Sequence, residues 1–191
     1  MLFLASQSPR RRQLLEQLGY AFSVLELDVP EVRQPGEPPA DYVRRVAREK
    51  AGAGLLQVAG VPGAVVIAAD TEVVLDDTVF GKPADSADAT RMLESLSGRT
   101  HLALSAVCCV DRGREAERLC VSRVRVALIE PARIAGYVAT GEPMGRAGAY
   151  AIQGLAAAFI EHLEGSYTGV MGLPLHETDG LLREFGVLPQ R

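Results

Sequence analysis

The 191-residue sequence is poor in cysteine, histidine and lysine, with three, three and two residues of each, and it contains no long apolar run. Cys108, Cys109 and Cys120 have neither C-x-x-C spacing nor a nearby histidine pair, which argues against a disulfide framework and against a zinc site. No run approaches the roughly 18 apolar residues of a membrane span, and the start MLFLAS lacks the basic region and cleavage pattern of a signal peptide. We therefore expect a cytoplasmic protein with no membrane partner.

An excess of positive charge is also absent. The formal net charge is −4, so no overall positive field attracts a nucleic acid polymer, and any phosphate must be bound by a local cluster. Hydrophobic residues make up 48% of the chain and charged residues 23%, as in folded soluble proteins. Because no stretch resembles a linker or a repeat, we expect a single domain over residues 1–191.

Several common catalytic motifs are missing. The sequence has no G-x-x-x-x-G-K-[ST] loop, no G-x-G-x-x-G after a strand and no G-x-S-x-G nucleophile elbow. His101, His162 and His176 show neither metal-binding spacing nor obvious partners for a catalytic triad, which favours structural roles for all three.

Strand-like and helix-like patterns alternate along the chain. Strands are expected at residues 1–5, 22–27, 64–75, 100–110, 119–129 and 156–163, and helices at 9–18, 41–58, 86–96, 131–140 and 175–185. The charged turn at residues 111–114 predicts an antiparallel hairpin between its neighbouring strands. This alternation predicts an α/β (α+β) fold, in which helices cover a sheet.

The start of the first expected helix is a candidate phosphate site. Ser8 suits the N-cap and Pro9 the first helical position, and Arg10, Arg11 and Arg12 follow. Three arginines in the first turn oppose the positive end of the helix dipole, which is unfavourable unless an anion is bound. Backbone N–H groups and guanidinium groups would bind phosphate there, and a solvated basic patch is the alternative interpretation.

Asp70 is a second candidate, because it ends the apolar run AVVIAA where a buried strand reaches the edge of the sheet. A buried carboxylate without a partner is costly, so it should meet a cation, a metal ion or several donors. Asp28 and Glu31, in the proline-rich loop 28–39, could join it, and such oxygen ligands suit Mg²⁺ or Mn²⁺ bridged to phosphates. A structural aspartate satisfied by turn amides is the alternative.

The two lysines, Lys50 and Lys82, are unusual in a chain whose other 18 basic residues are arginine. Composition alone suggests surface positions for both. However, Gly81-Lys82-Pro83 forms a rigid turn just beyond the strand of Asp70, where an ammonium group could contact phosphate oxygens. Gln153 is an ordinary loop amide unless it faces a base.

Seven short motifs in register over nearly the whole chain together resemble the Maf-type nucleoside triphosphate pyrophosphatase family. They are LASQSPRR at 4–11, AADT at 68–71, GKP at 81–83, LSGRTH at 96–101, GEP at 141–143, AGAYAIQG at 147–154 and GLPL at 172–175. The resemblance implies a mixed, strongly twisted sheet flanked by helices, with two lobes around a central cleft. It also implies a cytoplasmic protein, often a homodimer, that hydrolyses a nucleoside triphosphate to monophosphate and pyrophosphate with a divalent metal.

The same resemblance assigns roles to individual residues. Asp70 matches the proton acceptor of the family, and Arg10, Thr71 and Gln153 match the positions that set substrate selectivity. Other matching cleft residues are expected to bind phosphate, namely Ser8, Arg11, Lys50 and Lys82. Glu31, together with Asp70, is expected to bind the metal ion, Mg²⁺ or Mn²⁺.

The combination of Arg10, Thr71 and Gln153 resembles the branch of the family that acts on dTTP and UTP. One departure from the family pattern is Gly145-Arg146 in place of the usual Asp-Lys, which keeps a cation and loses an acid. Two alternatives stay open at this point. One is a pyrophosphatase for 7-methyl-GTP or another modified purine triphosphate, and the other is a non-catalytic nucleotide sensor in cell division, which would not need Asp70.

Overall fold

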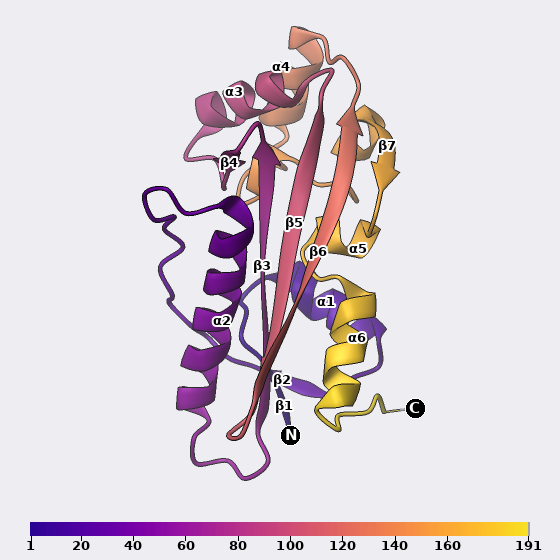
Figure 1. Ribbon diagram of the computed structural model, residues 1–191. Coiled ribbons are helices and arrows are strands. Elements are labelled where there is room, and N and C mark those ends of the chain that lie inside the picture. The colour runs from indigo at the N-terminus through magenta and orange to yellow at the C-terminus, as the bar shows by residue number, and fades with distance from the viewer. Residues whose placement is uncertain (191) are drawn as a thin grey trace.

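A computed structural model describes residues 1–190 and contains one mixed sheet of seven strands in this range (Figure 1). The strand order is β2-β1-β3-β5-β6-β7, and β4 pairs with β3 off this path. β1 is parallel to β2 and β3, and all other pairs are antiparallel. The strands are β1 (Leu2–Leu4), β2 (Phe22–Val24), β3 (Val65–Leu75), β4 (Thr78–Phe80), β5 (Thr100–Val110), β6 (Glu115–Val126) and β7 (Ile160–Glu164).

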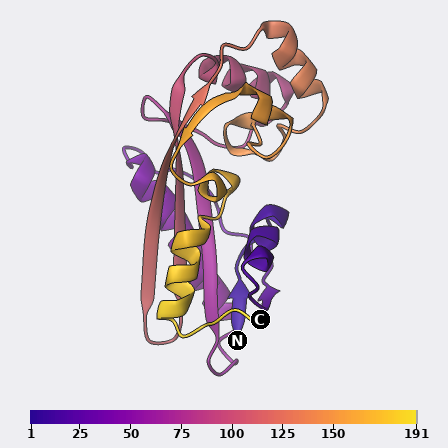
Figure 2. The same cartoon turned by 90° about the vertical axis from the view of Figure 1, so that its right-hand side faces the viewer.

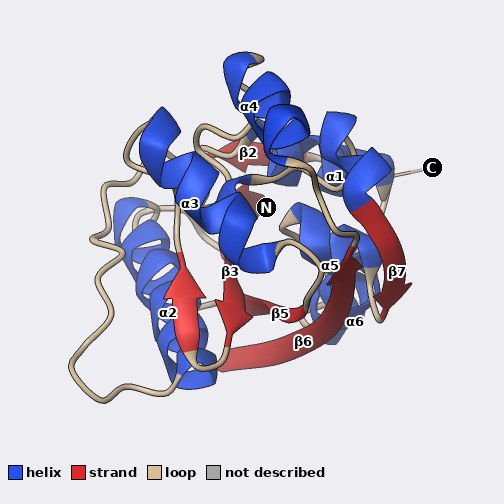
Figure 3. Ribbon diagram, turned by 90° about the horizontal axis from the view of Figure 1, so that it is seen from above, coloured by secondary structure: helices blue, strands red, loops and turns tan. Residues whose placement is uncertain are grey.

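Helices flank the sheet, as the alternation of patterns predicts. They are α1 (Pro9–Gln17), α2 (Pro39–Gln57), α3 (Ser86–Leu96), α4 (Pro131–Ala139), α5 (Tyr167–Met171) and α6 (Leu175–Glu184), with short 3₁₀ helices η1 (Ala147–Ala149) and η2 (Leu155–Phe159). Figure 2 shows α1 and α6 in the half of the molecule that holds both termini, and α3 and α4 at the opposite end. Seen from above in Figure 3, the strand direction turns from β3 to β6, which is the usual twist of a sheet.

The central strand β3 is buried on both faces in its first half. Val66 and Ala68 pack with the apolar side of α2, whereas Ile67 and Ala69 pack with α1 and α6. This explains why the segment is a continuous apolar run rather than an alternating one. A separate apolar cluster around Leu93 joins α3, α4, η1 and η2 at the other end of the sheet.

The predicted fold class is confirmed, but some predicted boundaries are wrong. Residues 155–159 form η2 rather than the start of a strand, because the Glu142 carboxylate accepts hydrogen bonds from the backbone nitrogens of Leu155 and Ala156. The second hairpin strand begins at Glu115 instead of residue 119, since Asp111 closes the turn by accepting hydrogen bonds from the backbone N–H groups of Gly113 and Arg114.

Three further elements differ from the prediction. Both β4 and α5 are absent from the predicted set, and the strand expected at 22–27 ends at Val24. None of the helices in the described chain combines the length and the apolar character that a membrane crossing requires.

Candidate active site

A cleft of about 920 Å³ lies beside the middle of β3, where that strand lacks a neighbour on one side. β1 pairs with β3 only as far as Ile67, and β4 pairs with it only from Val73 onward. Residues 68–72 therefore have no partner strand on this side, although β5 pairs with them on the other. Ligands of open α/β sheets bind in such crevices, beyond the carboxyl ends of parallel strands.

The cleft brings together all nine residues that the sequence singles out. Its lining includes Ser8, Arg10, Arg11, Glu31, Lys50, Asp70, Thr71, Lys82 and Gln153. Asp28, the second acid of the proline-rich loop, lines it as well. These residues come from the N-cap and first turn of α1, the loop before α2, α2 itself, β3, the turn after β4, and the segment after η1.

The first turn of α1 forms one wall of the cleft. Ser8 caps the helix, since its Oγ accepts a hydrogen bond from the Arg11 backbone nitrogen at 3.5 Å, and Pro9 is the first helical residue. Arg10 and Arg11 line the cleft, whereas Arg12 is exposed and forms an ion pair with Glu16 at 2.9 Å. Two of the three consecutive arginines are thus available to an anion in the cleft.

Arg11 is held in position by two hydrogen bonds. Its Nε donates to the carbonyl oxygen of Gly172 at 2.8 Å, and its Nη1 donates to Ser6 Oγ at 3.4 Å. Gly172 has a φ of +122°, a backbone conformation that residues with a Cβ rarely adopt. Glycine at this position therefore lets the carbonyl group turn toward the arginine.

Thr71 faces the same wall as Arg11. Its hydroxyl group lies 2.9 Å from Ser105 Oγ and donates a 3.4 Å hydrogen bond to the carbonyl oxygen of Gly172. Ser105 in turn donates to the carbonyl oxygen of Gly169 at 2.6 Å. This network fixes Thr71 on the face of β3 opposite to that of its neighbour Asp70.

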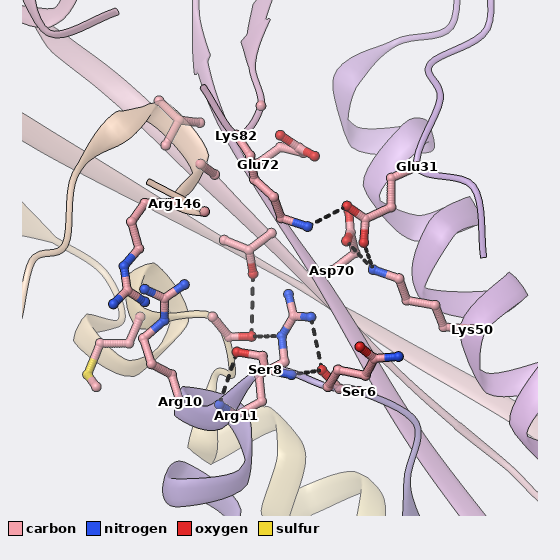
Figure 4. A pocket seen from close by; sticks show the side chains of 18 of the residues that line it. Ser6, Ser8, Arg10, Arg11, Glu31, Lys50, Asp70, Glu72, Lys82 and Arg146 are labelled. Atoms are coloured by element: carbon pink, nitrogen blue, oxygen red, sulfur yellow. Dashed lines mark hydrogen bonds and ion pairs between the residues drawn. The ribbon is translucent and has the colours of Figure 1, made fainter. Parts of the chain in front are cut away.

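Asp70 belongs to a chain of alternating charges on the α2 side of β3 (Figure 4). Lys50 Nζ contacts Asp70 Oδ1 at 2.8 Å and Glu31 Oε1 at 2.6 Å, and Lys82 Nζ contacts Glu31 Oε2 at 2.8 Å. Only 3% of Asp70 and 8% of Lys50 are exposed, so each needs the other to offset the loss of hydration.

Glu31 is the residue that links the two lysines. Burial alone would raise the pKa of its carboxyl group, but the charge and hydrogen bonds of Lys50, together with those of Lys82, outweigh burial and lower the pKa to about 2. Glu31 is therefore ionised throughout the neutral range, and both of its oxygens are occupied by ammonium groups.

Glu72 is a cleft residue that the sequence reasoning missed. It is 6% exposed, and its Oε2 is buried without a hydrogen-bond partner in the described chain. Burial, then the charges of Asp70 and Glu31, raise the pKa of Glu72 to about 8. One feature of the sequence could have pointed to Glu72 as a cleft residue. It lies two residues after Asp70, and residues two apart on a strand share a face.

Two arginines of the cleft each have a buried nitrogen without a partner in the described chain. The Nε atoms of Arg10 and Arg146 are buried without a hydrogen bond there, and burial lowers the pKa of Arg146. Both side chains extend into the cleft in Figure 4. Phosphate oxygens match the geometry of such guanidinium groups.

The cleft suits a metal ion that arrives together with phosphate. Within residues 1–190, no group of three or more histidine, cysteine, aspartate and glutamate side chains is arranged to hold a metal. Asp70 nevertheless has a buried oxygen, Oδ2, without a partner. Mg²⁺ is commonly held by one or two carboxylates plus substrate phosphates, so the residues present fit such an ion.

An open α/β crevice that collects two lysines and three arginines around buried carboxylates defines a protein that binds polyphosphate. The family model described as Maf-like protein matches residues 1–185. The chain belongs to the Maf family.

Two similar proteins cover almost the full length. A dTTP/UTP pyrophosphatase of Xanthomonas euvesicatoria is 57% identical over 188 residues, which is 97% of this chain and 99% of that protein. A nucleoside triphosphate pyrophosphatase of Xylella fastidiosa is 55% identical over 186 residues, which is 97% of this chain and 98% of that protein. Among solved structures, the Staphylococcus aureus Ham1 protein matches 66% of this chain and 71% of its own, with a TM-score of 0.45 and 13% identity.

Proposed function

We propose that the protein is a nucleoside triphosphate pyrophosphatase that hydrolyses dTTP and UTP to the monophosphate and pyrophosphate. The observation that carries the proposal is Asp70, a buried carboxylate with one free oxygen at the floor of a cleft rich in cations. The names of the similar proteins from Xanthomonas and Xylella support the same activity.

In this proposal the triphosphate is held by the cationic walls. Arg11 and the backbone N–H groups at the start of α1, capped by Ser8, bind on one side, and Lys50 and Lys82 bind on the other. Positioning and charge neutralisation of this kind supply most of the catalysis in phosphoryl transfer. The triphosphate replaces Glu31 as the partner of the two lysines.

Asp70 acts on the attacking water. Its free Oδ2 accepts a proton from the water as the water oxygen bonds to the α-phosphorus, and the bond from that phosphorus to the bridging oxygen breaks. Pyrophosphate leaves with the electron pair of that bond. Lys50 holds the other carboxylate oxygen of Asp70 at 2.8 Å and so keeps the carboxylate oriented.

The proposal includes a divalent metal ion, Mg²⁺ or Mn²⁺, held by Asp70 and by Glu31 once the lysines have turned to the phosphates. Such an ion, when bound, neutralises the charge of the phosphate oxygens. Oxygen ligands of this kind suit both ions.

Selectivity is assigned to Arg10, Thr71 and Gln153. The amide of Gln153 can match the carbonyl acceptors and the N3–H donor of thymine or uracil, and Arg10 and Thr71 add further donors. A 7-methyl-GTP pyrophosphatase is not favoured, since the similar protein from Xanthomonas is named a dTTP/UTP pyrophosphatase. A non-catalytic sensor is not favoured either, since the similar proteins carry pyrophosphatase names and this chain has Asp70, which a sensor would not need.

A cytoplasmic location and a homodimer complete the proposal. The three cysteines are free thiols, as in proteins of a reducing compartment. Sedimentation of the purified protein over a range of concentrations would measure the oligomeric state.

The test of the activity is pyrophosphate release from a panel of dTTP, UTP, dCTP, GTP and 7-methyl-GTP, with the wild type and Asp70→Asn. We expect release from dTTP and UTP, and a kcat lowered by about 10²–10⁴-fold in Asp70→Asn, because this is the usual contribution of a general base. A variant within tenfold of the wild type at saturating Mg²⁺ would remove Asp70 from the mechanism, and a panel without any release would refute the activity.

A further inference from the structure

Glu72 has no role in the mechanism above, yet it is among the most buried charged groups of the cleft. It is 6% exposed, it lines the cleft, and no hydrogen bond or ion pair satisfies its buried Oε2 in the described chain. An unpartnered buried carboxylate is costly, and proteins retain such groups mainly where a ligand will satisfy them.

The neighbours of Glu72 leave it without a protein cation. Lys50 divides its ammonium group between Asp70 and Glu31, and Lys82 contacts Glu31. Glu72 also lies close enough to Tyr42 to affect its phenol. Burial is the largest cause of the raised pKa of Tyr42, and the charge of Glu72 is the second largest. Three carboxylates and two ammonium groups meet here, so this side of the cleft carries a net charge of −1 when all are ionised.

Asp70 and Glu72 present their unused oxygens on one face of one strand. They are two residues apart on β3, so their Cα atoms are about 7 Å apart and both side chains project toward α2. Asp70 Oδ2 and Glu72 Oε2 are both buried and both lack a partner. Glu31, by contrast, has both oxygens bound to lysine.

We infer that Glu72 joins Asp70 and Glu31 as a ligand of the divalent cation, with phosphate oxygens of the nucleotide completing the coordination. The inference rests on the proposed function for its phosphate ligands and adds a residue that the motif resemblance does not assign. Mg²⁺ and Mn²⁺ accept hard carboxylate oxygens, and carboxylates plus phosphates are a usual set for Mg²⁺. With all three carboxylates ionised, a divalent cation would change the local charge from −1 to +1, which suits a polyphosphate.

The test measures metal binding directly, by the electron paramagnetic resonance signal of free Mn²⁺ in the presence of a dTTP analogue with a nonhydrolysable α,β-bridge. Glu72→Gln and Glu72→Val should each weaken Mn²⁺ binding by at least about tenfold, since even residues that only support a metal ligand are worth about 10–100-fold. Two variants are used, so that a folding defect in one does not decide the result. Glu177→Gln is the matched control, because Glu177 Oε2 is likewise buried without a partner and lies on α6 outside the cleft.

A second measurement distinguishes a metal-binding role of Glu72 from a purely structural role. Without metal, Glu72→Gln should bind the analogue as tightly as the wild type or more tightly, because glutamine places no charge beside the phosphates, whereas Glu72, with its pKa raised to about 8, is ionised in part near that pH. With Mg²⁺, the same variant should bind the analogue more weakly than the wild type. This reversal on addition of metal supports the inference, and a loss of affinity that is equal with and without metal overturns it.

The outcome for the activity can be distinguished from the outcome for Glu72. If the wild type releases pyrophosphate from dTTP and both Glu72 variants bind Mn²⁺ within twofold of it, the inference is wrong and the proposed function stands. If Mn²⁺ binding depends on Glu72 but no triphosphate is hydrolysed, the metal site stands and the proposed function is wrong. A wild type that binds no Mn²⁺ with the analogue overturns the inference as well.

Discussion

Glu31 lies between Lys50 and Lys82, in the place that the proposed mechanism gives to a phosphate group. It is held by 2.6 Å and 2.8 Å contacts, and its pKa of about 2 keeps it charged. The two lysines are thereby oriented toward the cleft before substrate arrives, instead of being free to extend into solvent. In the proposed binding mode a nucleotide competes with this internal carboxylate, so part of its binding energy would be used to displace Glu31.

A prediction at the residue scale concerns Gln153 and the choice of base. Gln153→Leu should reduce the preference for dTTP over dCTP more than it reduces kcat for dTTP, because a site built to hydrogen-bond a polar edge rejects bases that leave it unpaired. The measurement is the ratio of kcat/KM for dTTP, UTP, dCTP and 7-methyl-GTP in the wild type and the variant. A ratio that Gln153→Leu does not change would remove Gln153 from base selection.

At the scale of elements, α2 must pack close to β1 and β3 so that the side chain of Lys50 can contact Asp70. The close approach occurs at Gly54, one turn after Lys50. A Cβ atom there would lie 2.9 Å from Val66 Cγ1 and 3.0 Å from Ala5 Cβ. Glycine is thus required by packing between helix and sheet rather than by an unusual backbone angle.

Gly54→Ala should therefore destabilise the protein, by about 1–3 kcal/mol, as is usual for an overpacked core. Gly52→Ala is the matched control, since Gly52 lies on the same helix and a Cβ atom there would meet nothing within 4 Å. This control should raise stability by up to about 1 kcal/mol through helix propensity alone. Urea unfolding of both variants measures the difference, and equal effects would contradict the packing argument.

The elements also show what could be predicted from the sequence. The N-cap Ser8 and Pro9, the buried run before Asp70 and the charged turn at residues 111–114 are local signals, and the structure confirms each of these predictions. The placement of Thr71 opposite Ser105 depends on the register between β3 and β5, and no local pattern encodes that register. Glu72 was missed for a different reason, because its burial follows from the packing of α2 and not from its own neighbours in sequence.

The unexpected η2 shows the same limit. The segment Leu155–Phe159 is apolar enough for a strand, but Glu142, thirteen residues before Leu155, accepts hydrogen bonds from its first backbone nitrogens. The tertiary contact determines the conformation, which local propensity leaves undecided.

For the whole molecule, the response to acid depends on a buried histidine that contacts the segment after η1. His101 on β5 is 1% exposed, and its Nε2 lies 2.8 Å from the hydroxyl group of Tyr150, just after η1. Burial lowers the pKa of His101 from 6.5 to about 4. The unfolded chain therefore binds a proton near pH 6.5 that the folded protein does not bind until about pH 4, and stability falls as the pH decreases through this interval.

We expect the free energy of unfolding of the wild type to fall by about 2 kcal/mol more between pH 7 and pH 5 than that of His101→Gln, which has no imidazole to protonate. The control is His162→Gln, because His162 is exposed and its replacement should leave the pH dependence unchanged. Urea denaturation at pH 7, 6 and 5 gives the three curves. Parallel curves for the wild type and His101→Gln would show that His101 does not govern the loss of stability.

The open stretch of β3 at residues 68–72 also determines how the cleft can move. On the other side, β3 is paired with β5 without a break from Val66 to Val74, so the floor of the cleft is a rigid pair of strands that runs between both ends of the molecule. A hinge in these strands would break the hydrogen bonds between β3 and β5 that stabilise the sheet. In the proposed mechanism, closure around a nucleotide would therefore involve the rims of the cleft, namely the loop that carries Glu31 and the segment that carries Arg146, while Asp70 stays fixed.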